Sequence, residues 1–280
     1  MGSNNVLEIV RLTDVGLQRT HNEDAIASDA NIGFLILADG MGGYNAGEVA
    51  SEMAVLSIAA ELSEALGPHS SKSGLLDIAS QSYINNETLK KLLIDVVSNA
   101  NTSIYQASQT YSKCSGMGTT LVLGLFANHQ LLVGHVGDSR LYRLRNRQLE
   151  QLTEDHSLLQ EEIRAGILTP EQARDCPHKN LLTRALGVEP EVELELNAFN
   201  VEAGDLYLAC SDGLSDLLDD DLIASTLNDD ILDLTVAADT LVRLSNQFGG
   251  KDNISVILAK VNSRYDYQKT WYDHFVDWIK

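Results

Sequence analysis

Four aspartates stand at the ends of apolar segments, each beside or close to a glycine. Asp39 follows FLILA, Asp138 follows LLVGHVG, Asp212 follows LYLACS, and Asp252 precedes NISVILA. An aspartate at the end of a buried strand is costly to desolvate unless a partner compensates its charge. Any one of them could simply cap a turn, because Asp-Gly is common there. One local design at four places instead favours a shared cluster of bound cations.

The ligand type of such a cluster indicates its metal. Carboxylates and backbone carbonyls are hard oxygen donors, which suit Mg²⁺ or Mn²⁺ and argue against zinc or copper. Two such ions about 3.5–4 Å apart can share a bridging water and turn it into a hydroxide nucleophile. The neighbouring glycines Gly40, Gly137 and Gly213 have no Cβ, so they let the backbone approach the ions.

A basic residue precedes a further acidic pair near the N-terminus. Arg19 lies four residues before Glu23 and Asp24. An arginine there can bind a phosphate monoester in a bidentate manner while the acids face the metals. The alternative is a surface arginine that pairs with Glu23.

Alternating blocks of strands and helices must position these residues. Helical periodicity predicts helices at 47–66, 85–111, 219–227 and 231–247. Apolar runs predict strands at 6–12, 33–38, 119–127, 130–136, 140–145, 191–197, 204–210 and 253–261. The two-residue links Asn128-His129 and Asn146-Arg147 predict antiparallel hairpins. Strands in consecutive pairs favour an α+β sandwich of antiparallel sheets over a doubly wound parallel sheet.

We predict one domain over residues 1–262, in which the polar residues 153–187 form an inserted flap. The tail at 263–280 carries Tyr267, Trp271, Phe275 and Trp278 at helical spacing. This spacing predicts a helix that either packs on its own domain or binds a partner.

Composition excludes several classes of protein. The net charge of −20 argues against non-specific nucleic-acid binding, which needs a basic surface. The sequence contains no run of 18 apolar residues, so it predicts no membrane-spanning helix. The first residues also lack the pattern of a secretory signal. The three cysteines are widely spaced and lack a CxxC motif, which favours reduced thiols and a cytoplasmic location.

Eight segments in order resemble the PPM, or protein phosphatase 2C-type, metal-dependent serine/threonine phosphatases in their compact bacterial form. They span residues 14–259, nearly the whole chain: DVGLQRTHNEDA at 14–25, LADGMGGYNAGEVAS at 37–51, GMGTTLV at 116–122, VGDSRLYRLR at 136–145, LTEDHS at 152–157, NLLTRALG at 180–187, LACSDGLSD at 208–216 and GGKDNISVILA at 249–259. Any one of them is weak evidence, but eight in order are specific.

The resemblance implies a four-layer α-β-β-α sandwich with two Mn²⁺ or Mg²⁺ ions at one end of two packed sheets. By this resemblance Asp39 would bridge both ions and the Gly40 carbonyl would bind one of them. Asp212 and Asp252 would ligate the other ion.

The resemblance also implies roles around these ligands. Glu23 and Asp24 would act mainly through metal-bound waters, with Asp24 orienting the nucleophile, and Arg19 would hold the substrate phosphate. Asn253 would support the site by hydrogen bonding. Two further positions, Asp138 and Asp216, match a third and weaker metal site.

The implied reaction is hydrolysis of phosphoserine and phosphothreonine in proteins by a metal-activated water, without a phosphoenzyme. The implied partners are phosphorylated proteins and a cognate Ser/Thr kinase whose action the enzyme reverses. We expect a monomer that binds neither nucleic acid nor membrane.

Three positions depart from the family pattern. Met41 stands where animal members carry a histidine proposed as the general acid, so the leaving-group proton would come from a metal-bound water or another residue. His21 and His156 lie in nearby motifs, but we interpret both as structural or exposed. Tyr44 replaces the usual histidine after the glycine pair, and the flap segment DCPHKN is atypical.

Other phosphate-handling classes fit less well. No cysteine is followed six positions later by the arginine of a cysteine phosphatase, and no DxDx(T/V) motif follows the first strand. Gly42 and Gly47 have P-loop spacing, but Glu48 and Val49 replace the lysine and the hydroxyl residue. The remaining alternative is an inactive phosphatase fold that binds phosphoproteins, which lost metal ligands would signal.

Overall fold

The computed structural model describes residues 6–43, 46–67, 84–169, 172, 181–228 and 233–262. Tyr44, the segment DCPHKN and the predicted tail helix at 263–280 lie outside the described residues. Their predictions, and the proposed extent of the domain and flap, therefore stay predictions.

One sheet, called the β1 sheet below, joins the two ends of the described chain. Its strands follow the order β1-β11-β10-β7-β8 and all pairs are antiparallel. The bounds are β1 (Leu7–Asp14), β7 (Arg140–Arg145), β8 (Gln148–Gln151), β10 (Leu206–Cys210) and β11 (Ile254–Val261). The predicted Asn146-Arg147 hairpin link is confirmed, and both residues adopt the positive φ of a tight hairpin turn.

The second sheet, called the β3 sheet, has the strand order β2-β3-β5-β6-β9, with β4 paired to the end of β3. The bounds are β2 (Asp24–Asp29), β3 (Phe34–Met41), β4 (Gly118–Thr119), β5 (Leu121–Ala127), β6 (Gln130–Val136) and β9 (Glu195–Asn200). The link Asn128-His129 joins β5 to β6 as a tight antiparallel hairpin, as predicted.

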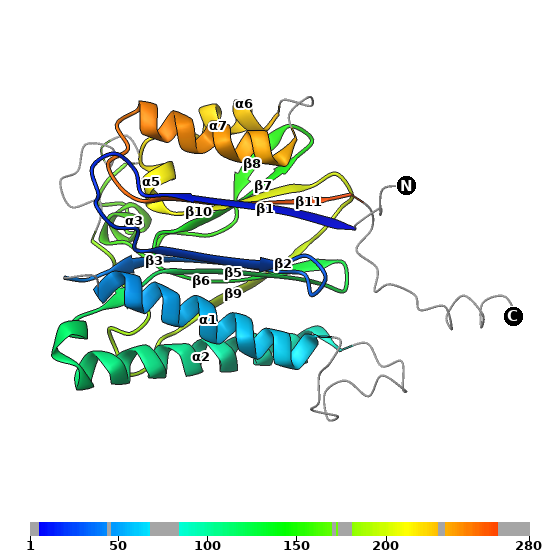
Figure 1. Cartoon of the computed structure of the whole chain (residues 1–280). Coiled ribbons are helices and arrows are strands. Elements are labelled where there is room, and N and C mark those ends of the chain that lie inside the picture. The colour runs from blue at the N-terminus through cyan, green and yellow to red at the C-terminus, as the bar shows by residue number, and fades with distance from the viewer. Residues whose placement is uncertain are drawn as a thin grey trace, which may run out of the picture.

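Four longer helices cover the outer faces of the two sheets (Figure 1). Helices α1 (Ala46–Leu66) and α2 (Asn86–Thr110) lie on the β3 sheet, and α6 (Asp220–Leu227) and α7 (Leu234–Gln247) lie on the β1 sheet. Side chains cap three of them, because Asn85, Asp219 and Asp233 each accept a hydrogen bond from a backbone N–H of the first turn. The short elements are η1 (Ser112–Cys114), α3 (Leu158–Arg164) and α5 (Asp212–Ser215).

Three layers of apolar side chains hold the four layers of secondary structure together. Strand β3 shows how: Leu35 and Leu37 face the other sheet, whereas Ile36 and Ala38 face the helices α1 and α2. Successive side chains of a strand point to opposite faces, so an uninterrupted apolar run is what a strand buried on both sides requires. The predicted α-β-β-α sandwich of two antiparallel sheets is confirmed.

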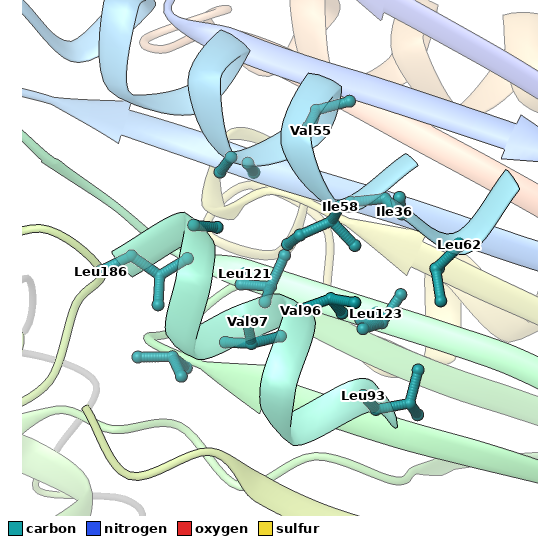
Figure 2. Packing of buried hydrophobic residues seen from close by; sticks show 14 of the residues in the cluster. Ile36, Val55, Ile58, Leu62, Leu93, Val96, Val97, Leu121, Leu123 and Leu186 are labelled. Atoms are coloured by element: carbon teal, nitrogen blue, oxygen red, sulfur yellow. The ribbon is translucent and has the colours of Figure 1, made fainter. Parts of the chain in front are cut away.

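The packing between the β3 sheet and its helices is dense and aliphatic (Figure 2). Ile58 of α1 and Val96 of α2 point toward Leu121 and Leu123 of β5, and all four side chains are buried. Burying one such side chain contributes about 1.5–3 kcal/mol, so this layer gives the adjacent strand ends a rigid support.

One predicted strand begins four residues too early. The prediction placed a strand at 191–197, but β9 pairs with β6 only from Glu195, which lies opposite His135. Strand β6 ends at Val136, so residues before Glu195 have little of β6 left to pair with. Val192 and Leu194 nevertheless pack against the helix-side core, which explains the apolar alternation that suggested a strand.

Five short elements were not predicted: β2, β8, η1, α3 and α5. Strand β2 is weakly apolar and β8 is polar, so neither carries the run of large apolar residues that marks a buried strand. None of the helices among the described residues is long and apolar enough to span a membrane.

Candidate metal centre

The β2–β3 hairpin brings two carboxylates face to face at the end of the β3 sheet. Asp24, the first residue of β2, lies directly opposite Asp39 near the end of β3. The backbone N–H of Gly40 donates to the carbonyl oxygen of Glu23 at 3.0 Å. Glu23, Asp24, Asp39 and Gly40 are therefore held together by strand pairing, although they come from two separate motifs.

The β1 sheet contributes two more carboxylates at the same end. Asp212 begins α5 two residues after the end of β10, and Asp252 stands two residues before β11. Strands β10 and β11 are antiparallel neighbours, so the end of one lies beside the start of the other. A Cβ on Gly213 would lie 2.0 Å from the carbonyl oxygen of Asn253, so only glycine allows α5 to approach β11 this closely.

Two side chains connect the two groups of carboxylates across the sheets. Ser211 Oγ donates to Asp24 Oδ2 at 2.8 Å. Asn253 Oδ1 accepts from the backbone N–H of Glu23 at 2.8 Å, and its Nδ2 donates to the carbonyl oxygens of Val15 and His21. Asn253 thus ties the segment that carries Glu23 to the start of β11.

Burial, together with mutual repulsion, makes the ionised carboxylates of this cluster unfavourable. Burial, followed by the charges of neighbouring carboxylates, holds the pKa of Asp39 and of Asp212 well above the usual range. Burial likewise raises the pKa of Asp24 to about 6, although Ser211 donates a hydrogen bond to its carboxylate. Ionising all of these carboxylates together is unfavourable unless bound protons or cations compensate their negative charge.

Buried oxygens without partners show where that charge would go. Asp24 Oδ1 and Asp212 Oδ1 are enclosed and accept no hydrogen bond from any described residue. A buried, unpaired carboxylate oxygen is strongly unfavourable unless a cation or a proton satisfies it. A Cβ on Gly40 would lie 2.1 Å from the Gly47 carbonyl oxygen, so only glycine allows the start of α1 to pack this closely against the end of β3. An all-oxygen donor set of this kind fits a hard divalent cation.

Arg19 lies at the edge of the cluster. Its Nη2 donates to Asp252 Oδ2 at 2.6 Å, and its side chain is 49% exposed. The structure therefore places Arg19 beside Asp252 and not in the surface pair with Glu23 that was the alternative. The hydrogen bond and charge of Asp252 raise the pKa of Arg19 despite its partial burial.

Asp138 and Asp216 lie close enough to Asp212 for their charges to act on it. Asp138 sits in the turn between β6 and β7, and Asp216 caps the end of α5. Burial, and then the charge of Asp155, raise the pKa of Asp138 to about 6. Asp138 and Asp216 both act on the pKa of Asp212, so all the sequence-predicted carboxylates share one electrostatic neighbourhood.

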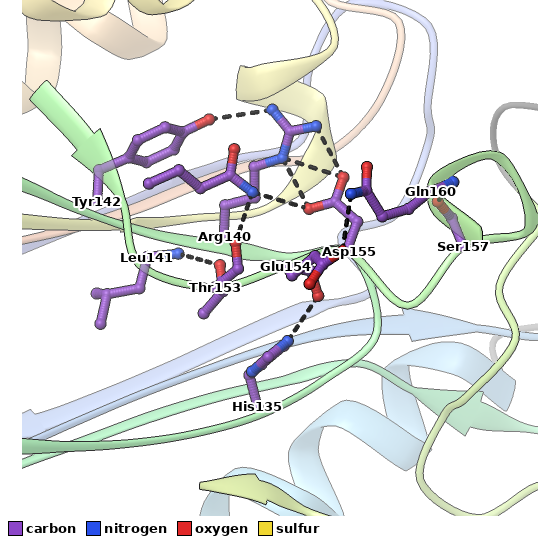
Figure 3. Close-up of polar contacts among 10 residues, drawn as sticks. His135, Arg140, Leu141, Tyr142, Thr153, Glu154, Asp155, Ser157 and Gln160 are labelled. Carbon is purple, nitrogen blue, oxygen red and sulfur yellow. Dashed lines mark hydrogen bonds and ion pairs between the residues drawn. The ribbon is translucent and has the colours of Figure 1, made fainter. Parts of the chain in front are cut away.

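Several supporting residues were not predicted from the sequence. Thr120 Oγ1 accepts from the backbone N–H of Asp39 at 3.0 Å and shares a 2.7 Å hydrogen bond with Ser139 Oγ. Figure 3 shows Arg140 bound to Asp155, with Nε–Oδ1 and Nη2–Oδ2 distances of 3.0 and 2.7 Å. These four supporting residues lie inside three of the eight family-like motifs, at 116–122, 136–145 and 152–157, so the motifs themselves were the available signal.

Met41 and the two histidines of the neighbouring motifs, His21 and His156, have different environments. The Met41 side chain packs on the backbone of β4, because a Cβ added to Gly118 would lie only 2.8 Å from Met41 Cε. His21 is exposed. His156 is buried and lies 3.2 Å from both the Gly137 nitrogen and Glu195 Oε2.

The comparison with protein families agrees with this arrangement. Residues 18–247 match the family model for Protein phosphatase 2C. This chain belongs to the protein phosphatase 2C family. The resemblance drawn from the eight motifs is therefore confirmed.

Curated relatives of this phosphatase 2C chain match almost end to end. It is 37% identical over 257 residues to the serine/threonine phosphatase stp of Listeria welshimeri, covering 89% of this chain and 94% of that protein. It is also 37% identical over 259 residues to the protein phosphatase PhpP of Streptococcus pneumoniae, covering 91% of this chain and 98% of that one.

Solved structures show the same fold. The crystal structure of the Mycobacterium tuberculosis serine/threonine phosphatase PstP/Ppp has a TM-score of 0.78 and 36% identity, covering 92% of this phosphatase 2C chain and 99% of that one. The catalytic domain of PstP in complex with two manganese ions has a TM-score of 0.75 at 36% identity, with 92% and 99% coverage.

Proposed function

We propose that this phosphatase 2C chain hydrolyses phosphoserine and phosphothreonine esters in proteins, with divalent metal ions bound at the carboxylate cluster. The observation that carries the proposal is the set of converging buried carboxylates, of which Asp24 and Asp212 each keep one enclosed oxygen without a partner. The family and the named serine/threonine phosphatases among its relatives support the reaction class. The manganese ions in the PstP structure support the metal type.

The residues that would hold the ions are those at the meeting point of the two sheets. Asp39 and the Gly40 carbonyl would serve from the β3 sheet, and Asp212 and Asp252 from the β1 sheet. When bound, divalent ions supply the Lewis acidity that polarises a phosphoryl oxygen and lowers the pKa of a water molecule. We propose Mn²⁺ or Mg²⁺ as the ions, because the donors are all oxygens.

The surrounding acids would act around these ligands. Glu23 and Asp24 lie beside Asp39 and would orient water molecules through their carboxylates. Asp138 and Asp216, whose charges act on Asp212, would form a third, weaker cation site.

Arg19 would bind the phosphate of the substrate. It lies at the exposed edge of the cluster, and its ion pair with Asp252 engages Nη2 of a guanidinium that carries five N–H donors. A phosphoryl group with two or three negative oxygens can accept two of these hydrogen bonds at once. Met41 has no titratable proton, so the proton of the leaving group must come from another position.

The rival class, an inactive fold that binds phosphoproteins, is not favoured, because every carboxylate that the family pattern requires is present. We further propose that the enzyme opposes a Ser/Thr kinase, works in the cytoplasm and acts as a monomer. These proposals follow from the family resemblance and the composition of the chain.

The test uses the purified full chain stripped of metal with a chelator. Addition of Mn²⁺ or Mg²⁺ should restore phosphate release from p-nitrophenyl phosphate and from phosphoserine and phosphothreonine peptides. Asp39→Asn should lower kcat by at least ~10²-fold, because it removes a charge from the centre of the cluster. Glu52→Gln, on the exposed face of α1, is the matched control and should leave kcat unchanged.

Two results would refute the proposal. A correctly folded wild-type chain that stays inert with both metals on all three substrates is not this enzyme. Metal-dependent binding of phosphopeptides without phosphate release would instead support the binding module.

A further inference from the structure

Two histidines and a glutamate form a second cluster close to the carboxylates but separate from them. His135 lies in β6, His156 precedes α3, and Glu195 is the first residue of β9. One donor atom from each lies within 4.8 Å of the others, a spacing that could suggest a further metal site.

The geometry of the rings argues against a metal here. The two imidazole rings are stacked, with centroids 4.5 Å apart and an angle of 19° between their planes. An imidazole lone pair lies in the plane of its ring, so a metal about 2.0–2.1 Å from a ring nitrogen lies near that plane. The planes of these two stacked rings are nearly parallel, so one ion cannot lie in both planes at bonding distance from a nitrogen of each ring.

The hydrogen bonds assign a different role to His156. The Gly137 N–H donates to Nδ1 at 3.2 Å, so Nδ1 must carry a lone pair. The proton of the neutral ring is therefore on Nε2, which lies 3.2 Å from Glu195 Oε2 and donates to it. His135 Nε2 lies 2.8 Å from the Glu154 carbonyl oxygen, which can only accept, so His135 donates there (Figure 3).

The environment keeps His156 neutral. Burial, followed by the charge that its stacked neighbour His135 would carry, lowers the pKa of His156, and Glu195 opposes this only in part. A neutral ring keeps the Nδ1 lone pair that the Gly137 N–H requires.

His156 binds Gly137, the residue directly before Asp138, through the N–H that Nδ1 accepts. The contact is reciprocal, because the backbone N–H of His156 donates to the Gly137 carbonyl oxygen at 2.9 Å. Gly137 has a φ of +103°, and a Cβ there would lie 2.7 Å from Thr120 Cγ2. Gly137 is therefore confined between Thr120, which also binds the Asp39 N–H, and His156.

The residues just before His156, at 153–155, contact the start of β7, which follows Asp138 in the chain. Thr153 Oγ1 accepts from the backbone N–H of Leu141 at 3.0 Å, and Asp155 binds Arg140 (Figure 3). Of these contacts, the one from His156 is made with the residue next to Asp138 in the sequence. Its loss should therefore disturb the Asp138 turn locally while the other contacts hold the strand.

We propose that Glu195 and His156 are a positioning pair: Glu195 fixes the Nε2–H form of His156, and Nδ1 then holds the Gly137 peptide so that Asp138 faces the carboxylate cluster. Neither residue touches the cluster itself. The part of this proposal that concerns metal binding and activity rests on the proposed phosphatase function, whereas the part that concerns hydrogen bonding does not.

Two amide substitutions separate the two nitrogens of His156. In His156→Asn the amide oxygen can stand near the place of Nδ1 and accept from Gly137. In His156→Gln the longer side chain reaches the place of Nε2 and leaves Gly137 without its acceptor. Glu193→Gln, an exposed carboxylate two residues from Glu195, is the control.

Three measurements are needed. In the metal-free wild type, long-range ¹H–¹⁵N NMR correlations of the ring should show His156 protonated on Nε2. Amide hydrogen exchange at Gly137 should be at least ~10-fold faster in His156→Gln and close to wild type in His156→Asn and Glu193→Gln. Mn²⁺ affinity measured by calorimetry should fall about 10-fold in His156→Gln, as for other residues that orient metal ligands, and recover in His156→Asn.

The outcomes that overturn the proposal are equally specific. A ring protonated on Nδ1 in the wild type refutes it without any variant and whether or not His156→Gln folds. It is also refuted if His156→Asn and His156→Gln show the same Gly137 exchange. If the chain proves not to be a phosphatase, the NMR and exchange results still decide whether the pair positions Gly137.

Discussion

Replacing Asp138 by asparagine should stabilise the metal-free protein. Burial raises the pKa of Asp138 to about 6 from an ordinary value of 3.8. A shift of about two units corresponds to roughly 3 kcal/mol of unfavourable free energy for the ionised carboxylate. Asparagine does not ionise, but its new N–H donors need partners, so we expect a net gain of about 1–3 kcal/mol at pH 7.5.

The gain should depend on pH in a defined direction. The folded protein holds the Asp138 proton more tightly than the unfolded chain does. The wild type therefore loses stability as the pH rises from about 4 to about 6, and the loss is complete above the folded pKa. The difference between Asp138→Asn and wild type should grow by about 1 kcal/mol between pH 5 and pH 7.5.

The assay is urea unfolding in the presence of a chelator at several pH values between 5 and 8. Asp205→Asn is the matched control of opposite sign. The Asp205 carboxylate accepts from Arg145 Nε and Nη2 at 2.7 and 2.6 Å, and its pKa lies below the usual range, with these hydrogen bonds outweighing burial. Asp205→Asn should lose about 3 kcal/mol, and the loss should stay constant above pH 5, because Asp205 titrates below that range.

Two outcomes would show that the reasoning is wrong. One is an Asp138→Asn variant that is less stable than wild type in chelator at pH 7.5. The other is a stability difference that does not change between pH 5 and pH 7.5. Saturating Mn²⁺ should reverse the order of the two proteins, because only the wild type keeps the carboxylate at this position.

Three further changes test other parts of the site. Gly40→Ala should cost at least ~2 kcal/mol of stability in a urea titration, because its Cβ would lie 2.1 Å from the Gly47 carbonyl oxygen; an unaltered midpoint would contradict this packing. Arg19→Lys should raise KM for a phosphopeptide about 10-fold with a smaller change in kcat, since lysine cannot bind a phosphate in a bidentate manner; an unchanged KM would remove Arg19 from the phosphate site. Arg140→Leu should cost about 3–5 kcal/mol, because it leaves the Asp155 carboxylate without its partner; a loss below 1 kcal/mol would show that the pair is dispensable for stability.

The sequence predicted the architecture because its buried strands have no polar face. The runs FLILA and VILA, at residues 34–38 and 256–259, are apolar throughout, as a strand between two packed layers requires, and the tight links between strands carried recognisable turn residues. The start of β9 could not be predicted in the same way. Its apolar alternation continues past the end of β6, so the boundary is set by the neighbouring strand and not by the residues themselves.

In the candidate site, too, the sequence revealed some features and not others. The aspartates could be found because each stands at one end of an apolar run. Their supporting contacts could not, because each joins distant parts of the chain. Ser211 reaches Asp24, and Arg19 reaches Asp252, across most of the sequence. No local pattern marks a serine or an arginine that finds its partner only after two sheets have packed.

The pairing of β1 with β11 has a consequence for how the protein comes into being during synthesis. Leu7 of the first strand lies opposite Val261 of the last, and the strand β11 that completes the β1 sheet follows directly on Asp252 and Asn253. Contacts between such distant residues form late, because a long loop must close first. While the ribosome is still translating the last strand, the nascent chain already holds every strand of the β3 sheet, but the β1 sheet lacks the strand that joins β1 to β10. The arrival of β11 completes the β1 sheet and brings Asp252 to the other carboxylates, so an incomplete chain would carry most of the acids without the complete centre that they form.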